Sequence, residues 1–123
     1  MPRIRILLVA ALVVLALAVA GVVQASSQKT TGKLVGNVGP GFTITLVKGG
    51  KAVKTLKAGT YKITVHDKAS IHNFHLFGPG VNKKTGVPFT GTKNWTVKLT
   101  KGSYTYRCDI HFMSGMIGHF KVK

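Results

Sequence analysis

A cysteine, a histidine and a methionine stand close together at Cys108, His111 and Met116. Their side chains offer a soft thiolate, an imidazole and a thioether within nine positions. This mixture of ligands favours copper over harder cations, which prefer carboxylate and carbonyl oxygens. Two imidazoles and a thiolate in a trigonal arrangement, with a weak axial methionine, form the type 1 or blue copper sites of electron-transfer proteins. The segment therefore supplies three ligands of such a site and requires a second histidine from elsewhere.

The second histidine is expected in the segment from residue 71 to 77, whose composition predicts a strand. Successive side chains of a strand point to opposite faces, so His72 shares a face with Phe74 and Leu76, and His75 lies on the other. Because Phe74 and Leu76 favour the core, we predict His72 as the ligand. His75 is then an exposed residue, which replaces His72 only if the register shifts by one.

These residues follow a spacing that resembles the cupredoxin family, in particular the small plastocyanin, pseudoazurin and amicyanin group. The residues that carry the resemblance are Cys108-x2-His111-x4-Met116-x-Gly118, with His72-Asn73 upstream. The resemblance covers nearly all of the chain beyond the N-terminal leader. It implies an all-β, cupredoxin-like Greek-key β-sandwich of about eight strands, one copper ion that alternates between Cu(I) and Cu(II), and transfer of single electrons.

The resemblance also assigns roles to residues near the ligands. It implies that Met116, rather than Met113, is the axial ligand. Asn73 follows the first ligand histidine, and its side chain is expected to tie the two ligand-bearing segments together. One departure is visible, because many relatives carry proline where this chain has Ile110. A less rigid loop around His111 is the expected consequence.

Enzymatic chemistry is not expected. The chain has only two acids, Asp67 and Asp109, so it holds no carboxylate pair and no Ser-His-Asp set. Four protein ligands leave no open position for a substrate, whereas catalytic metals keep one open. Zinc could bind two imidazoles and a thiolate, but a methionine in fourth place argues against it.

The first residues resemble an export signal. Arg3 and Arg5 precede an unbroken apolar run of 18 residues, 6–23, and small residues follow. We therefore predict a signal peptide over residues 1–25, or an uncleaved anchor, since 18 residues are the lower limit for spanning a bilayer. Residues 26–32 are expected to form a short tether and residues 33–123 the copper-binding domain. Either reading places the domain outside the cytoplasm: secreted, periplasmic or at the cell surface.

The single cysteine agrees with a metal site in an exported domain. Cys108 has no partner for an internal disulfide, which leaves a free thiol, an intermolecular bridge or a metal ligand. A buried cysteine that acts only as a small apolar residue is the alternative. The neighbouring His111 and Met116 favour ligation, and we expect a monomer.

Beyond residue 32, short apolar alternations separated by glycine, proline and asparagine are typical of a sandwich or barrel. Residues 78–93 are too irregular for a strand and are predicted to form one long connection. The predicted strands are Lys33 to Val38, Phe42 to Val47, Ala52 to Thr55, Thr60 to His66, His72 to Phe77, Asn94 to Leu99, Ser103 to Cys108 and Ile117 to Lys123.

The charge is strongly positive. Eighteen lysine and arginine residues give a formal net charge of +16, which falls by two if the leader is removed. Such a field favours an acidic redox partner protein, or an anionic membrane or wall surface. Nucleic acid is the usual partner of a basic protein. Export argues against it, and the lysines are spread singly along the predicted strands rather than clustered.

Three functions remain open from the sequence. An exported electron carrier is the leading interpretation. The same site could instead capture copper at the cell surface and deliver it to another protein. The third interpretation is a basic envelope-binding module on a cupredoxin scaffold, for which the net charge is the motive.

Overall fold

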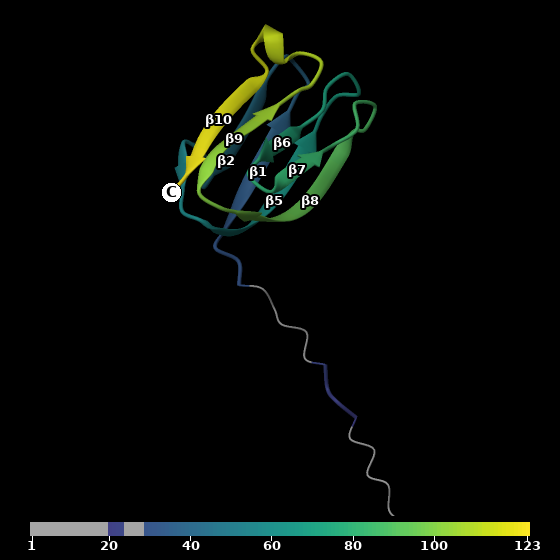
Figure 1. Cartoon of the computed structure of the whole chain (residues 1–123). Helices are drawn as coiled ribbons and strands as arrows, with labels where there is room; N and C mark the ends of the chain where they lie inside the picture. Colours follow the sequence, from purple (N-terminus) through teal and green to yellow (C-terminus); the bar gives the residue numbers. More distant parts are fainter. Residues whose placement is uncertain (1–19, 24–28) are drawn as a thin grey trace, which may run out of the picture.

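Two β-sheets packed face to face make up the domain in the computed structural model, which describes residues 20–23 and 29–123 (Figure 1). The predicted signal peptide or anchor lies largely outside these residues. Within the described part of the chain, no helix is long and apolar enough to cross a membrane. The strands are β1 (Gly32–Val38), β2 (Ile44–Lys48), β3 (Lys51–Ala52), β4 (Thr55–Leu56), β5 (Gly59–Asp67), β6 (His75–Gly78), β7 (Val81–Lys84), β8 (Gly91–Leu99), β9 (Gly102–Arg107) and β10 (Ile117–Val122), and a 3-10 turn, η1, spans Phe112–Ser114.

The first sheet has the strand order β3-β2-β1-β5-β8, and the second has the order β4-β10-β9-β6-β7. Most neighbours are antiparallel, but β1 pairs with β5 in parallel, and so does β10 with β4. β9 runs directly into Cys108, and β10 returns antiparallel beside it. The connection between β9 and β10 is therefore held at both ends by paired strands.

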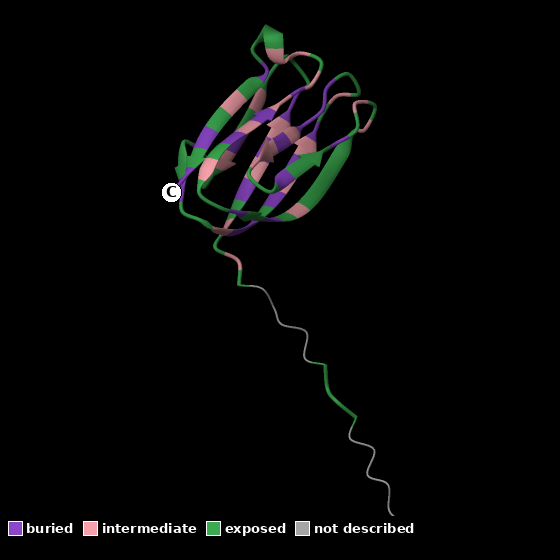
Figure 2. Cartoon of the chain, viewed as in Figure 1, coloured by how far each residue is buried: buried purple, intermediate pink, exposed green. Residues whose placement is uncertain are grey.

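Alternation along the strands explains the core. In β1 and β9, every second side chain is buried, and the intervening ones are partly or fully exposed (Figure 2). Aromatic rings fill the space between the sheets: Phe74 stacks on Tyr106 at 5.8 Å between ring centroids, and Tyr104 stacks on Phe120 at 5.2 Å. Among the residues that the structure describes, the buried apolar side chains lie between Leu34 and Val122. The described residues before β1 therefore add no buried apolar side chain to the core.

The all-β sandwich is confirmed, and several element boundaries are corrected. In the described residues, ten strands replace the expected eight or so: the expected strand from Ala52 to Thr55 divides into β3 and β4, which lie in different sheets, and β7 is an additional strand. The expected long connection over residues 78–93 contains β7 and the start of β8. The expected strand from His72 to Phe77 begins only at His75. Its first three residues instead form part of the loop that follows β5.

Candidate metal centre

Three candidate ligands meet at one end of the sandwich, which we call the metal end. The Nδ1 atoms of His72 and His111 lie 2.9 Å apart, and the Sγ atom of Cys108 lies 3.9 and 3.6 Å from them, respectively. Within the described residues, these are the histidine, cysteine or acidic side chains that converge in a group of three able to hold a metal. Ligands bound to one ion at about 2.0–2.3 Å lie roughly 3–4 Å apart, so the spacing suits a single ion.

Backbone hydrogen bonds hold the Cys108 and His111 side chains in place. The Cys108 N–H donates to the Met116 carbonyl at 3.0 Å, which closes the loop between β9 and β10. The His111 carbonyl accepts from Ser114 at 2.9 Å and from Met116 at 3.3 Å. Gly115 has a φ of 92°, a left-handed conformation that glycine adopts without a steric penalty. The loop is therefore tightly wound around His111.

His72 reaches the same point from the β5–β6 loop. Its side chain is fully buried, and the ring packs edge-on against Phe42 at 5.2 Å between centroids. A Cβ on Gly39 would lie 3.1 Å from the His72 ring, so this glycine leaves room for the imidazole. The His72 Nε2 atom is buried and lacks a protein hydrogen-bond partner in the described residues. The sequence argument selected His72 from a strand alternation, but the residue lies outside the strand.

The two methionines of the loop differ in burial. Met116 is fully buried directly behind the loop, whereas the Met113 side chain is 88% exposed. The assignment of Met116 as the axial ligand stays a prediction. The burial of Met116 and the hydrogen bond between its backbone and that of Cys108 are compatible with it.

The donor set suits copper. One thiolate and two imidazoles are softer than the oxygen ligands that Mg²⁺ and Ca²⁺ require, and no carboxylate belongs to the group. Burial of Cys108 and His72 keeps water from both ligands. These residues therefore fit a type 1 copper ion.

Asn73 joins the two ligand-bearing segments. Its Oδ1 accepts from the Asp109 N–H at 2.8 Å, and its Nδ2 donates to the Asp109 carboxylate at 3.0 Å and to the Thr85 carbonyl at 3.3 Å. Asn73 follows His72 directly, and Asp109 follows Cys108. These bonds therefore set the spacing between the two ligands.

Asp109 is the centre of a cluster that the sequence reasoning missed. His75 Nδ1 lies 2.8 Å from its carboxylate, and Arg107 donates to it at 3.0 Å. Burial raises the pKa of Asp109, but hydrogen bonds from Asn73, His75 and Arg107 outweigh that effect and lower the pKa to about 2. His75, expected to be an exposed residue, is instead only 16% exposed and also contacts Asn82.

The second acid also lies at the metal end. Asp67 is almost fully buried and accepts a hydrogen bond from the Thr85 hydroxyl at 3.1 Å. The same hydroxyl accepts from the Phe74 N–H at 2.9 Å. Burial raises the pKa of Asp67, although bonds from Ala69 and Thr85 oppose the increase. The sequence contains only these two acids, Asp67 and Asp109. Their rarity was the sequence signal that could have pointed to a structural role for them near the metal centre.

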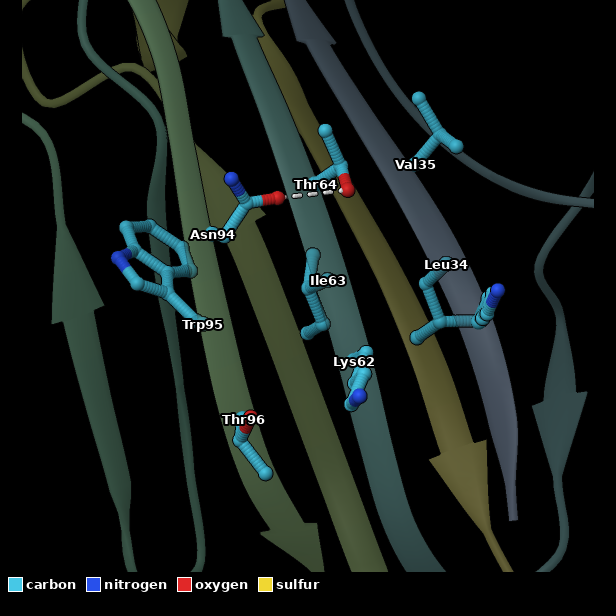
Figure 3. A pocket seen from close by; sticks show the side chains of 9 residues that line it. Leu34, Val35, Lys62, Ile63, Thr64, Asn94, Trp95 and Thr96 are labelled. Carbon is cyan, nitrogen blue, oxygen red and sulfur yellow. Dashed lines mark hydrogen bonds between the residues drawn. The ribbon is translucent and has the colours of Figure 1, made fainter. Parts of the chain in front are cut away.

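A shallow groove of about 460 Å³ lies elsewhere, on the outer face of β1, β5 and β8 (Figure 3). Lys33, Lys62 and Thr96 are exposed along it, and Thr64 donates a hydrogen bond to Asn94 across it. The groove shares no residue with the metal centre.

No family model matches the chain. Several solved structures are similar to it. The copper protein rusticyanin is 24% identical, with a TM-score of 0.57 over 74% of this chain and 76% of that one. Rusticyanin from Thiobacillus ferrooxidans is 27% identical, with a TM-score of 0.53 over the same shares of the two chains. A multi-copper oxidase from Pediococcus acidilactici is 20% identical, with a TM-score of 0.54 over 80% of this chain but 28% of its own.

These similarities agree with the site. They support the cupredoxin-like sandwich, while the narrower plastocyanin, pseudoazurin and amicyanin group stays a prediction. The histidines and the cysteine meet at one end of that sandwich. The chain therefore has the cupredoxin-like fold of the type 1 blue copper proteins.

Proposed function

We propose that this protein is an exported electron carrier that holds one copper ion with His72, Cys108, His111 and Met116. One observation carries the proposal: the two Nδ1 atoms and the thiol converge within 4.8 Å of one another. The likeness to rusticyanin, a copper protein, supports the choice of metal. Export rests on the sequence features of residues 1–25.

The protein's part in such a reaction is to hold the ligands still. Copper bound there would take up and give up one electron by alternating between Cu(II) and Cu(I). Cys108 and His111 are held by the hydrogen-bonded loop, and His72 by the Asn73–Asp109 bonds and the Phe42 ring. Ligands fixed by their surroundings move little when the charge at the site changes. A small rearrangement keeps electron exchange fast.

The His111 ring is the proposed route for the electron. His111 is partly exposed, while His72 and Cys108 are buried. Large apolar side chains around it are open to solvent: Phe42 at 57%, Ile110 at 55% and Met113 at 88%. Phe42 also packs against the His111 ring at 4.7 Å. An apolar surface of this kind suits short-lived docking of a redox partner, because it needs no specific ion pairs.

An enzymatic role is not proposed. Four protein ligands would leave no position for a substrate. The likeness to a multi-copper oxidase concerns 28% of that chain and so only one of its parts.

The visible absorption spectrum of residues 26–123 during titration with Cu(II) tests the proposal. An intense blue band that bleaches on reduction is expected, and Cys108→Ser should abolish it. Two matched pairs test the ligands: His72→Ala and Met116→Leu should alter the band, whereas His75→Ala and Met113→Leu should leave a blue site. Pale copper binding that does not depend on Cys108 would refute the assignment.

Copper delivery is the second candidate, and the exposure of Met113 favours it. An 88% exposed thioether beside His111 could receive Cu(I) on its way to an acceptor. Transfer of Cu(I) to a chelator that slows in Met113→Leu, without loss of the blue band, would support delivery. An unchanged transfer rate would leave electron transfer as the function.

A further inference from the structure

The lysines gather at the end of the sandwich opposite the metal centre. β9 and β10 connect the two ends: Lys101 precedes β9 and Cys108 follows it, while Met116 precedes β10 and Lys123 follows it. The chain also enters β1 at this opposite end, where the Thr31 N–H donates to Thr60 and the Ala58 N–H donates to Lys123 (Figure 1). We call this region the lysine end. Six of its exposed lysines are Lys48, Lys51, Lys54, Lys57, Lys101 and Lys123.

The strand register adds further lysines to the same region. Lys33 and Lys62 are direct neighbours on β1 and β5, and Lys98 is paired with Thr60 at the start of β5. Lys33 and Lys62 both line the groove on β1, β5 and β8. The expectation that lysines are spread singly is therefore wrong. They are separated in sequence, but the parallel pairing of β1 with β5 and the antiparallel pairing of β5 with β8 bring them to one end.

No acid balances this charge. Asp67 is buried, and Asp109 is held by Arg107 and His75 at the metal end. No lysine of the described residues forms an ion pair. The lysines at the lysine end therefore repel one another, and this repulsion lowers the stability of the folded domain. Solubility alone would not require the lysines to be gathered at one end.

We propose that the lysine end docks on the surface of an anionic phospholipid bilayer and turns the metal end away from it. The lysines stand on turns and strand ends of both sheets, at the end of the molecule rather than within one narrow cleft. A broad cationic face suits a plane of phosphate groups better than a single extended polymer chain. Residues 29–31 also leave from this end, toward the apolar run of residues 6–23 in the sequence. This docking does not depend on the copper proposal.

The test uses sedimentation of residues 26–123 with lipid vesicles, so that the apolar run cannot insert. Strong binding is expected to vesicles of equal parts phosphatidylglycerol and phosphatidylcholine, and none to phosphatidylcholine alone. Added salt should release the protein, because it screens charges beyond about 10 Å at 0.1 M. Cys108→Ser should bind as well as the original chain, which separates this proposal from the copper site.

Two variants of equal charge decide whether the lysine end is the docking surface. One replaces Lys48, Lys51, Lys57 and Lys101 by glutamine, and the other replaces Lys68, Lys83, Lys84 and Lys93, which lie away from that end. The first should weaken vesicle binding at least about tenfold, since each lysine near an anionic surface contributes appreciably, and the second less than about threefold. Equal losses would overturn the proposal and indicate an effect of net charge alone.

Orientation provides a second readout in a Trp95→Phe background. Ala58→Trp places a fluorophore at the lysine end, and Met113→Trp places one at the metal end. Lipids with brominated chains should quench the first and spare the second. Quenching of the second alone would overturn the orientation. Tighter binding to a soluble anionic wall polymer than to vesicles would overturn the choice of a bilayer.

Discussion

At the scale of single residues, Asn73 and Asp109 set the distance between the two ligand-bearing segments. Three hydrogen bonds of the Asn73 amide join the loop after β5 to the residue after Cys108 and to Thr85. The Asn73 side chain is almost fully buried, at 2% exposed, and its bond to Thr85 is buried as well. The ligand geometry therefore depends on an uncharged side chain that does not itself bind metal.

Replacement of Asn73 by alanine should be costly. It leaves the Asp109 N–H and the carbonyl of the buried Thr85 without these partners, at about 1–3 kcal/mol of unfolding free energy. Asn94→Ala is the control, because it removes an exposed hydrogen bond to Thr64 and should cost no more than about 0.5 kcal/mol. Urea denaturation of the metal-free proteins measures both. Equal losses would contradict the role assigned to Asn73.

Asp109 should make the metal-free protein sensitive to acid. Its pKa in the folded protein is about 2, below the ordinary value of 3.8, so its stabilisation is present above pH 3.8 and is lost as pH falls toward 2. The difference in unfolding free energy between the original chain and Asp109→Asn should therefore shrink across that range. Asp67 is present in both proteins, and its contribution cancels. A difference that does not vary with pH would show that the carboxylate charge is irrelevant.

The ligand residues were predictable only in part. The spacing of Cys108 and His111 identified two members of the cluster, because residues three positions apart in the chain lie close together in any fold. His72 joins them as expected and is buried like Phe74 and Leu76, but the expected strand does not extend to it, since β6 begins at His75. The bonds from His75 and Arg107 to Asp109 depend on strand pairing between β6 and β9, which local sequence does not reveal.

At the scale of elements, β1 closely approaches Phe74, which lies in the loop just before β6. Gly36 lies in β1 opposite the Phe74 ring, and a Cβ there would come within 2.8 Å of it. Phe74 is itself held between Tyr106 and Trp95. The absence of a side chain at Gly36 thus lets the ring lie flat in the core, two residues from His72.

Gly36→Ala should therefore destabilise the domain by about 1–3 kcal/mol, the usual cost of overpacking a core. Gly41→Ala is a matched control, because no atom lies within 4 Å of the added Cβ. Thermal unfolding should show a clear fall in Tm for the first change and little effect of the second. If both proteins unfold like the original, the close approach of β1 to Phe74 would not be important for stability.

The strands could be predicted better than their pairing. Alternation in β1, β5 and β9 is clear in the sequence, and these strands lie within one or two residues of the expected positions. β3 and β4 have two residues each, too few for any periodicity. β7 carries Asn82, Lys83 and Lys84 on an exposed edge, so its composition favours a loop. Its hydrogen bonds to β6 create the strand, rather than its own side chains.

At the scale of the whole molecule, the lysines are unevenly distributed. The metal end exposes Phe42, Ile71, Ile110 and Met113 together with a few lysines such as Lys68, whereas more lysines are exposed at the opposite end. This distribution could not be foreseen from the sequence, where the lysines alternate with core residues along the strands. It appears only when the register aligns the strand ends.

Repulsion among the lysines predicts that salt stabilises the domain. Screening should raise Tm in NaCl, and a gain of about 1 kcal/mol corresponds to roughly 4–8 °C for a domain of this size. The variant with Lys48, Lys51, Lys57 and Lys101 replaced by glutamine should be less sensitive to salt than the variant changed at Lys68, Lys83, Lys84 and Lys93. Scanning calorimetry at low and high NaCl measures the difference. Equal sensitivity would show that the repulsion is not concentrated at the lysine end.

The lysine end also gives the molecule a permanent electric dipole along its long axis. In the field of an acidic protein, the resulting torque would turn the lysines toward that protein and the His111 ring away from it. Long-range attraction would then produce encounters in which the electron has the full length of the sandwich to cross. A productive redox partner should therefore present a neutral, apolar contact surface, and the acidic character expected from net charge alone would hinder the exchange.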